Sequence, residues 1–337
     1  MFKTNDLNDS TFNLDTKPSV NLNNKNNTNF IINSFPNNVA PGNLNSLKRL
    51  TTLQNIHLNS CFRHNYFNSS SCDFQYVIPS DIKNVVSLRL VSIEIPNAWY
   101  LFSHKQKNNV FNIEVNIDNT VTTYTITIPD GNYDSDSLQQ FLNTTYFSQS
   151  KTDTYLKYIH FSIDNNSFKS TFEVLDNPSI TVFSFSLCFL YDINENPMNT
   201  VGWLLGFRLS SYLNVSVKIQ SEGLFDACGD KYIYFGLNDY QYNNNSNNIV
   251  GFDKSIMDEN ILAKIPMING KLSFIIDENN NLLAKKRVYN GPVTLRKLYI
   301  KIMDKFGNVI DLNNMDFSFT LEVELLYESF NFKDVSA

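Results

Sequence analysis

The sequence has few cysteines, and their spacing excludes several kinds of site. The four cysteines are Cys61, Cys72, Cys188 and Cys228. No two of them have the C-x-x-C spacing that is typical of metal and redox sites. Four scattered thiols suit a reducing compartment, and we expect them to be free and structural.

Clusters of positive charge and long hydrophobic runs are also missing. The chain has 27 Lys and Arg against 33 Asp and Glu, a formal net charge of −6, and no basic block. Phosphate contacts need clustered Lys and Arg, so we predict that nucleic acid is not a partner. No apolar run approaches the roughly 20 residues of a membrane span, so we predict none. The first 15 residues lack the apolar core of a signal peptide.

Catalytic motifs are missing as well. A Ser-His-Asp site needs a histidine beside a nucleophile on a strained turn, yet His57, His64, His104 and His160 all lie away from any G-x-S-x-G pattern. Cys61 is near His64 in sequence, but nothing evident orients that imidazole. No H-E-x-x-H, calcium-loop or dinucleotide motif occurs. We therefore predict that the chain is not an enzyme, with no catalytic, cofactor-binding or metal-ligating residues and no cofactor.

Phe (27 residues) and Tyr (17 residues) are abundant, and both favour pleated, half-buried strands. Near the C-terminus, alternate residues are apolar over 317–325 and again over 298–302. This period of two predicts two strands, each with one apolar face. The first face consists of Phe317, Phe319, Leu321, Val323 and Leu325, and the second includes Leu298, Ile300 and Ile302. Gly307 favours a turn over residues 304–308 between them.

Two polar residues of the last strand, Glu322 and Glu324, fall on its outer face. We expect a solvated surface there, or a cross-strand partner such as Lys301. Upstream, the apolar phase of residues 85–95 slips by one position. It runs through Val86, Leu88 and Leu90 and continues through Val91, Ile93 and Ile95. Such a slip predicts a bulge or a bend.

Residues 105–208 differ in sequence pattern from the segments on either side. Leu138, Phe141 and Leu142 recur at helical spacing after Asp134 or Ser135, which can cap a helix. Short strands surround this predicted helix. The segment VGWLLGFR (201–208) suggests a tightly packed corner, because no phosphate-loop pattern surrounds its glycines. Alternation resumes at Leu213, and we expect the main sandwich to resume there.

The N-terminal arm, residues 1–50, is polar and rich in Asn, a composition typical of a disordered tail. One apolar cluster, FIINSFP, interrupts it. We expect Phe30, Ile32 and Phe35 to dock on a neighbouring protein, the alternative being a spacer without a partner.

Four motifs resemble those of one group of proteins. IHLNSCFRHNYFNSSSCDFQYVIPSDIKNVVSLRLVSIEIPNAWYLFS is followed in order by IPDGNYDSDSLQQFLN, VGWLLGFR and YNGPVTLRKLYIKIMDKFGNVIDLNNMDFSFTLEVELLYE. Over about residues 51–328 the chain resembles structural proteins of giant viruses, the nucleocytoplasmic large DNA viruses. Similar chains are minor capsid or penton-like virion components built on a jelly roll. The N-terminal arm has no counterpart among these motifs.

The fold class that we predict is all-β: a jelly-roll β-sandwich with an inserted small α+β module and an extended N-terminal arm. The predicted domains are 1–50 (arm), 51–104 plus 209–330 (sandwich) and 105–208 (inserted module). The resemblance implies a minor capsid or penton (vertex) protein of the virion that assembles in the host cytoplasm. Its expected partners are the major capsid protein, neighbouring minor capsid proteins and symmetric copies of itself. Two alternatives are a virion-surface fibre or receptor-binding protein that binds a host glycan or protein, and an enzyme built on a sandwich.

Overall fold

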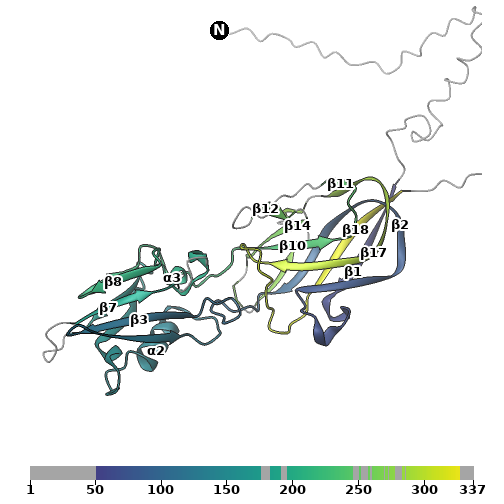
Figure 1. Ribbon diagram of the computed structural model, residues 1–337. Coiled ribbons are helices and arrows are strands. Elements are labelled where there is room, and N and C mark those ends of the chain that lie inside the picture. Colours follow the sequence, from purple (N-terminus) through teal and green to yellow (C-terminus); the bar gives the residue numbers. More distant parts are fainter. Residues whose placement is uncertain are drawn as a thin grey trace, which may run out of the picture. The chain divides into compact units, whose positions relative to one another are not determined.

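Figure 1 shows the computed structural model of the chain. The residues that the structure describes are 51–175, 183–190, 196–245, 250–251, 257–258, 260–268, 270–271, 273–277, 283–284 and 286–326. The arm, with Phe30, Ile32 and Phe35, lies outside the described residues.

The largest sheet has nine strands in the order β1-β18-β2-β17-β10-β14-β16, with β11 added on β17 and β15 added on β2. Every printed pairing in it is antiparallel. Its strands are β1 (Thr51–Asn59), β2 (Asp73–Pro96), β10 (Tyr232–Asn238), β11 (Asn244–Asn245), β14 (Ile261–Pro266), β15 (Phe274–Asp277), β16 (Leu283–Ala284), β17 (Arg287–Met303) and β18 (Ser318–Leu326).

This sheet is folded into two facing layers. Two strands, β2 and β17, separate β18 from β10 in the strand order. A flat sheet would place β18 and β10 about 14 Å apart, since neighbouring strands are about 4.8 Å apart. The ring centroids of Phe319 on β18 and Phe235 on β10 are nevertheless only 5.0 Å apart. The chain thus contains an all-β sandwich, which confirms the fold class expected from the sequence.

The apolar faces predicted for the C-terminal strands are confirmed. Phe319, Leu321 and Val323 are buried in one core with Ile300 and Ile302. The bulge is confirmed too: Thr320 pairs with Ser92 and Leu321 with Leu90, so Val91 is the extra residue. One detail differs. The segment analysed over 85–95 is the later part of a single 24-residue strand, β2, whose first part pairs with β17 and whose later part pairs with β18.

A second hydrophobic core lies between β2 and β10 in the sequence. It is covered by a four-stranded sheet, β4-β3-β7-β8, and a three-stranded sheet, β5-β6-β9. Phe111 on β3 and Phe172 on β6 join the two sheets, with ring centroids 6.1 Å apart. The strands are β3 (Val110–Ile117), β4 (Thr120–Thr127), β5 (Ile159–Ile163), β6 (Ser170–Val174), β7 (Phe183–Cys188), β8 (Ser211–Val215) and β9 (Lys218–Gln220).

The predicted helix is confirmed as α2 (Ser135–Thr145), with Asp134 as its N-cap in a capping box with Ser137. The same hydrogen bonds hold the pKa of Asp134 below its usual value. Two α2 side chains also cover the edge of β5: Gln139 Oε1 accepts from Ile163 N at 2.9 Å, and Asn143 bonds both backbone groups of Phe161. The helix therefore protects a strand edge as well as adding to the core.

The segment 201–208 is a tightly packed corner, as expected, and it includes the one-turn helix α3 (Val201–Leu204). A Cβ on Gly202 would lie 2.4 Å from the Phe189 ring. Gly206 has φ of +94°, and a Cβ there would lie 2.5 Å from the Gly223 carbonyl oxygen. Both positions require glycine.

One expected boundary differs. The stretch after Arg208 was predicted to resume the sandwich, but β8 pairs with β7 and β9 pairs with β6. Phe225 is also buried in the second core. Alternation predicts that a segment is a strand but not which sheet it joins. The prediction that residues 211–220 belong to the main sandwich was therefore wrong, because β8 and β9 belong to the sheets of the second core. Whether the inserted module folds separately stays a prediction.

Candidate functional site

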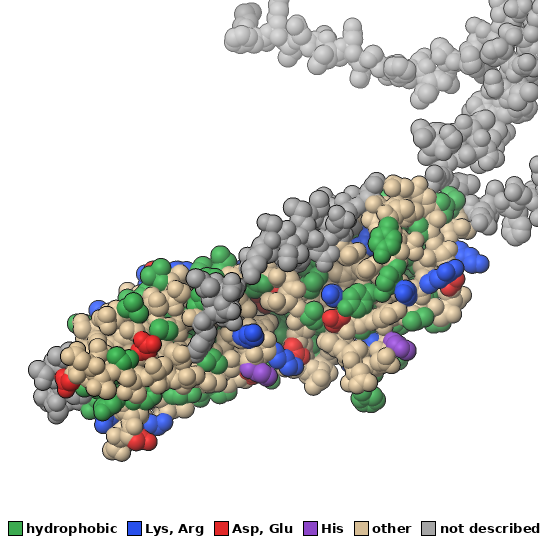
Figure 2. All heavy atoms as spheres, in the orientation of Figure 1, with side chains coloured by type: hydrophobic (Ala, Val, Ile, Leu, Met, Phe, Trp, Pro, Cys, Tyr) green, Lys and Arg blue, Asp and Glu red, His purple; other side chains and the backbone are tan. Residues whose placement is uncertain are grey.

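Two strongly exposed phenylalanines lie in the loop between β1 and β2, residues 60–69, which we call the aromatic loop. It contains two 3-10 turns, η2 (Ser60–Phe62) and η3 (Tyr66–Asn68). Phe62 is 75% exposed and Phe67 is 95% exposed. Figure 2 shows hydrophobic side chains at the tip of this projecting segment. Leaving two phenylalanine rings in water sacrifices the free energy that their burial would provide.

A partly buried ion pair, Arg63 with Asp316, supports the aromatic loop. The Arg63 side chain is 7% exposed, and its Nη1 lies 2.6 Å from Asp316 Oδ1. Arg63 also donates to the carbonyl oxygens of Ser60 and Ser69, at 2.9 and 3.3 Å. Its guanidinium lies 3.9 Å from the centroid of the Tyr66 ring. Because a guanidinium has five N–H donors, Arg63 can bond several parts of the loop at once. The loop is therefore structured, and it holds the two phenylalanine side chains outward.

The strand that leads into the aromatic loop is a long sheet edge. Among the described residues, β1 pairs with β18 alone, in unbroken register over nine residues. Its sequence, TTLQNIHLN, has no Lys, Glu, Asp, Arg or Pro, and Leu53 is 62% exposed. Proteins usually guard such an edge with charge, proline or a bulge. The unguarded edge and the aromatic loop are contiguous in sequence over residues 51–69, and together we call them the assembly surface.

The outer carboxylates of β18 find partners other than the expected Lys301. Glu322 accepts from Arg89 Nε at 2.8 Å. Glu324 bonds Lys286, Thr51 and Ser87, and these bonds, that of Lys286 first, lower its pKa to about 2. The expectation of Lys301 was wrong because β18 lies between β1 and β2, and β17, which contains Lys301, is not its neighbour.

The histidines and thiols do not form a catalytic set in the part of the chain that the structure describes. His57 bonds Thr320 Oγ1 at 3.0 Å, and His160 bonds Glu173 at 3.1 Å. Burial raises the pKa of the Cys72 thiol, which favours the inert protonated form. Within that same part, no cluster of three or more His, Cys, Asp or Glu is arranged to hold a metal. No helix there is long and apolar enough to span a bilayer.

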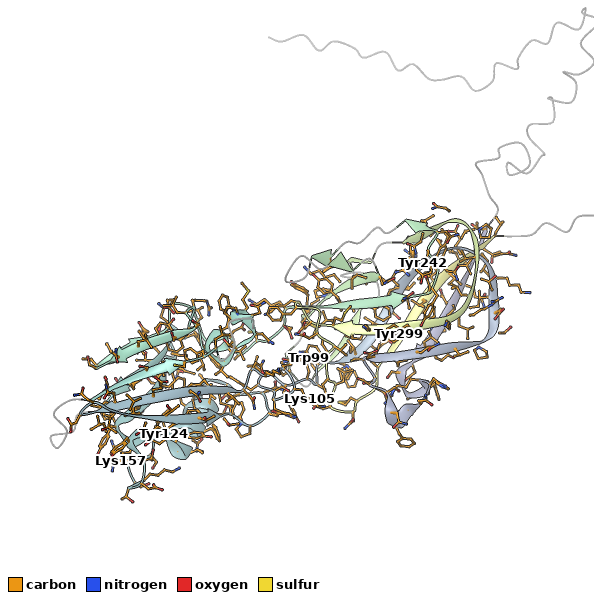
Figure 3. The ribbon with its side chains drawn as sticks, in the orientation of Figure 1. Trp99, Lys105, Tyr124, Lys157, Tyr242 and Tyr299 are labelled. Carbon is orange, nitrogen blue, oxygen red and sulfur yellow. The ribbon has the colours of Figure 1, made fainter. Side chains whose placement is uncertain are left out.

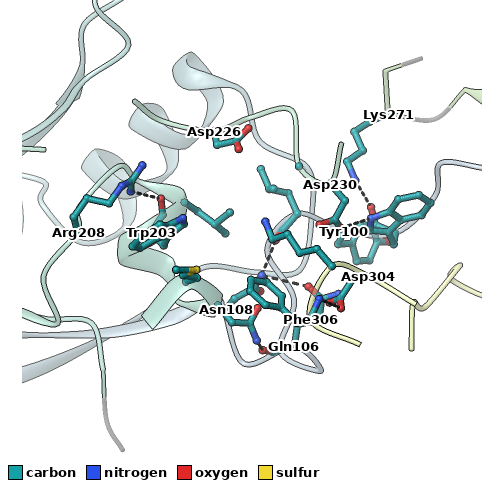
Figure 4. Close-up of a pocket in the computed structure, with 17 residues that line it drawn as sticks. Tyr100, Gln106, Asn108, Trp203, Arg208, Asp226, Asp230, Lys271, Asp304 and Phe306 are labelled. Carbon is teal, nitrogen blue, oxygen red and sulfur yellow. Dashed lines mark hydrogen bonds between the residues drawn. The ribbon is translucent and has the colours of Figure 1, made fainter. Parts of the chain in front are cut away.

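A crevice lies where the chain passes from β2 into the second core, near Trp99 and Lys105 (Figure 3). It consists of two adjoining cavities of about 70 and about 420 Å³. Both of the chain's tryptophans, Trp99 and Trp203, line the smaller one, and Figure 4 shows side chains from well-separated stretches of the sequence converging on it. The sequence offered no signal for this site, because those stretches are far apart along the chain.

The ionisable groups of the crevice are held in hydrogen bonds. Trp99 Nε1 donates to Asp230 at 3.1 Å, and Lys271 Nζ donates to the Trp99 carbonyl oxygen at 3.1 Å. Asp304 Oδ1 accepts from the backbone of Phe306 and Asn308, which closes the predicted turn around Gly307. Burial lowers the pKa of Lys271 to about 8 and raises that of Asp304. Asp230 and Asp304 therefore bond an indole and the backbone, whereas two other carboxylates of the crevice pair with basic side chains, Asp130 with His104 and Asp311 with Lys105.

No protein-family model matches the chain, and no curated protein sequence matches it. Among solved structures it is similar to the mavirus penton protein, with 10% sequence identity and a TM-score of 0.42 over 82% of this chain and 100% of that one. A likeness of this size says nothing about function.

Proposed function

We propose that the chain is a structural protein of a virion, a minor capsid or penton (vertex) component of a large icosahedral DNA virus. Its partners would be the major capsid protein, neighbouring minor capsid proteins and symmetric copies of itself, assembled in the host cytoplasm. The motif resemblance over residues 51–328 supports the kind of virus. The all-β sandwich supports the role, because a sandwich buries its core and leaves loops and edges free for lateral contacts.

The observation that carries the proposal is the assembly surface. Phe62 and Phe67 are 75% and 95% exposed on a loop that the partly buried Arg63–Asp316 ion pair structures. Aromatic anchors that are ordered before binding lose little entropy when they enter a partner's pocket. The hydrogen bonds of Arg63 and Ser60 lie within the protein, so the partner needs to supply only an apolar pocket with a polar rim. We also propose that the chain is not an enzyme.

Fractionation of purified virus particles tests the role. The chain should be found with the capsid shell, and its presence in infected-cell lysate but not in particles would refute the proposal. A photo-crosslinking amino acid in place of Phe67 should then yield adducts with capsid proteins in intact particles. The same amino acid at Tyr155, which is 46% exposed on the second core, is the matched control. Equal yields from the two positions would mean that the aromatic loop is not the contact.

A further inference from the structure

The chain's two tryptophans are concentrated at a single place, the crevice. Trp99 lines both of its cavities, and Trp203 lines the smaller one. Tyr100, which is 36% exposed, lines both cavities beside them. The indole of Trp203 is backed by the guanidinium of Arg208, 4.2 Å from its ring centroid. Trp99 is only 2% exposed and belongs to the sandwich core, so the rings that a ligand could contact are those of Trp203 and Tyr100, and flat rings of this kind are the usual walls of small-molecule sites.

The charges in the crevice cancel. Five Lys or Arg and five Asp line the two cavities together, with His104 as the remaining ionisable cation. Several of them pair with each other: His104 with Asp130, and Lys105 with Asp311. Both pairs are largely exposed to solvent, so each contributes little by itself, and what counts for a ligand is the equal number of cationic and anionic side chains around it. The balance favours a ligand without net charge.

The remaining polar groups of the crevice are mostly amides. Gln106, Asn108, Asn199, Asn308 and Asn313 line it. Some of them position the walls: Asn199 donates to the Gln106 carbonyl oxygen at 3.1 Å, and Asn313 to that of Ala98 at 2.7 Å. An amide both donates and accepts, as a hydroxyl does. A volume of about 420 Å³ lies within the usual range of ligand pockets.

We propose that the crevice binds a neutral saccharide. The Tyr100 ring would lie against the C–H face of a sugar ring in the larger cavity. Gln106 and Asn199 would bond its hydroxyl groups. This chemistry is shared by a free sugar and by the same sugar on a glycoprotein. The inference goes beyond the virion role, since a chain that never enters particles could still bind a sugar here.

Tryptophan fluorescence of the full chain tests the proposal directly, because every tryptophan of the chain lines the crevice. The probes are methyl glycosides of glucose, galactose, mannose and N-acetylglucosamine, in buffer free of glycerol. At least one should change the emission saturably. Tyr100→Ala should then raise the Kd about tenfold or more, which is ~1.4 kcal/mol, while both tryptophans stay in place to report. Tyr155→Ala, the control, should bind as the wild type does.

Gln106→Leu gives a second test that does not remove a ring. It replaces a hydrogen-bonding amide by an apolar side chain of similar size, so it should also weaken binding while the unfolding midpoint stays near that of the wild type. The same sugars on a glycoprotein, titrated in parallel, distinguish a free from a carried ligand. The proposal is overturned if none of the four glycosides changes the emission, or if Tyr100→Ala binds as tightly as the wild type.

Discussion

The support of the aromatic loop can be tested by Asp316→Asn, which removes one charge and keeps the shape of the side chain. In the wild type, Asp316 accepts from Arg63 at 2.6 Å and from Ser60 Oγ at 2.7 Å. The variant leaves the guanidinium, in a side chain 7% exposed, without its counter-charge. Arg63 stays ionised, because a guanidinium does not lose its proton in proteins.

The expected loss of stability lies between two known limits. Removing one partner of a fully buried pair costs about 3–5 kcal/mol, whereas an exposed pair contributes about 0–1 kcal/mol. Asp316 is 25% exposed, and Arg63 keeps its bonds to the carbonyl oxygens of Ser60 and Ser69. We therefore expect the free energy of unfolding to fall by about 2 kcal/mol.

Urea unfolding measures this loss, and Asp81→Asn is the matched control. Asp81 pairs with Arg296, whose side chain is 74% exposed, so its loss should cost less than about 1 kcal/mol. Hydrogen exchange gives a second readout, since the amides of residues 62–68 should exchange faster in Asp316→Asn than in the control. If Asp316→Asn is no more destabilising than Asp81→Asn, the partly buried pair is not what holds the loop.

Four further outcomes are expected. Phe319→Ala should cost about 3–5 kcal/mol, because it empties a packed aromatic site; an unchanged urea midpoint would contradict the assigned face. Lys271 has a pKa of 10.5 in the unfolded chain and of about 8 in the folded chain. The unfolded chain therefore binds more protons between these two values, so the free energy of unfolding should rise with pH across that window. Lys271→Met should flatten the rise. Stability should fall as pH drops from 4.5 towards the pKa of Glu324 near 2, by about 1 kcal/mol after solvent screening, and Glu324→Gln should remove this slope. Replacing 105–226 by a Gly/Ser linker should leave a sandwich that unfolds cooperatively by circular dichroism, whereas replacing 105–208 should not, because it strands β8 and β9 without partners.

Much of the sandwich could be predicted because a period of two is a local signal. The burial of Phe319 and Leu321 follows from alternation alone, and the bulge at Val91 follows from one slipped position. Pairing between distant strands is not local. The partners of Glu322 and the sheet that contains Leu213 depend on which strands meet, and nothing in either segment specifies that.

The crevice could not be predicted for the same reason. Trp203 lies in a segment that the sequence marked as a packed corner, and Trp99 ends a strand motif. Their convergence depends on contacts between segments about a hundred residues apart, such as the bond from Asn199 to the Gln106 carbonyl oxygen. The aromatic loop, by contrast, is contiguous, and its exposure could have been suspected from the Asn and Ser residues that surround its two phenylalanines.

The assembly surface and the crevice have no residue in common, so the two proposed roles can be separated by mutation. Phe67 is 95% exposed on the loop after β1, and Tyr100 lies in the crevice after β2. Phe67→Ser removes an exposed ring and should leave sugar binding intact while it weakens incorporation into particles. Tyr100→Ala should weaken sugar binding and leave incorporation into particles intact. Both proteins should unfold at the wild-type midpoint, since exposed side chains contribute little to the core. A variant that lost both properties with the fold intact would show that the two surfaces are coupled, which no contact between them in the described part of the chain explains.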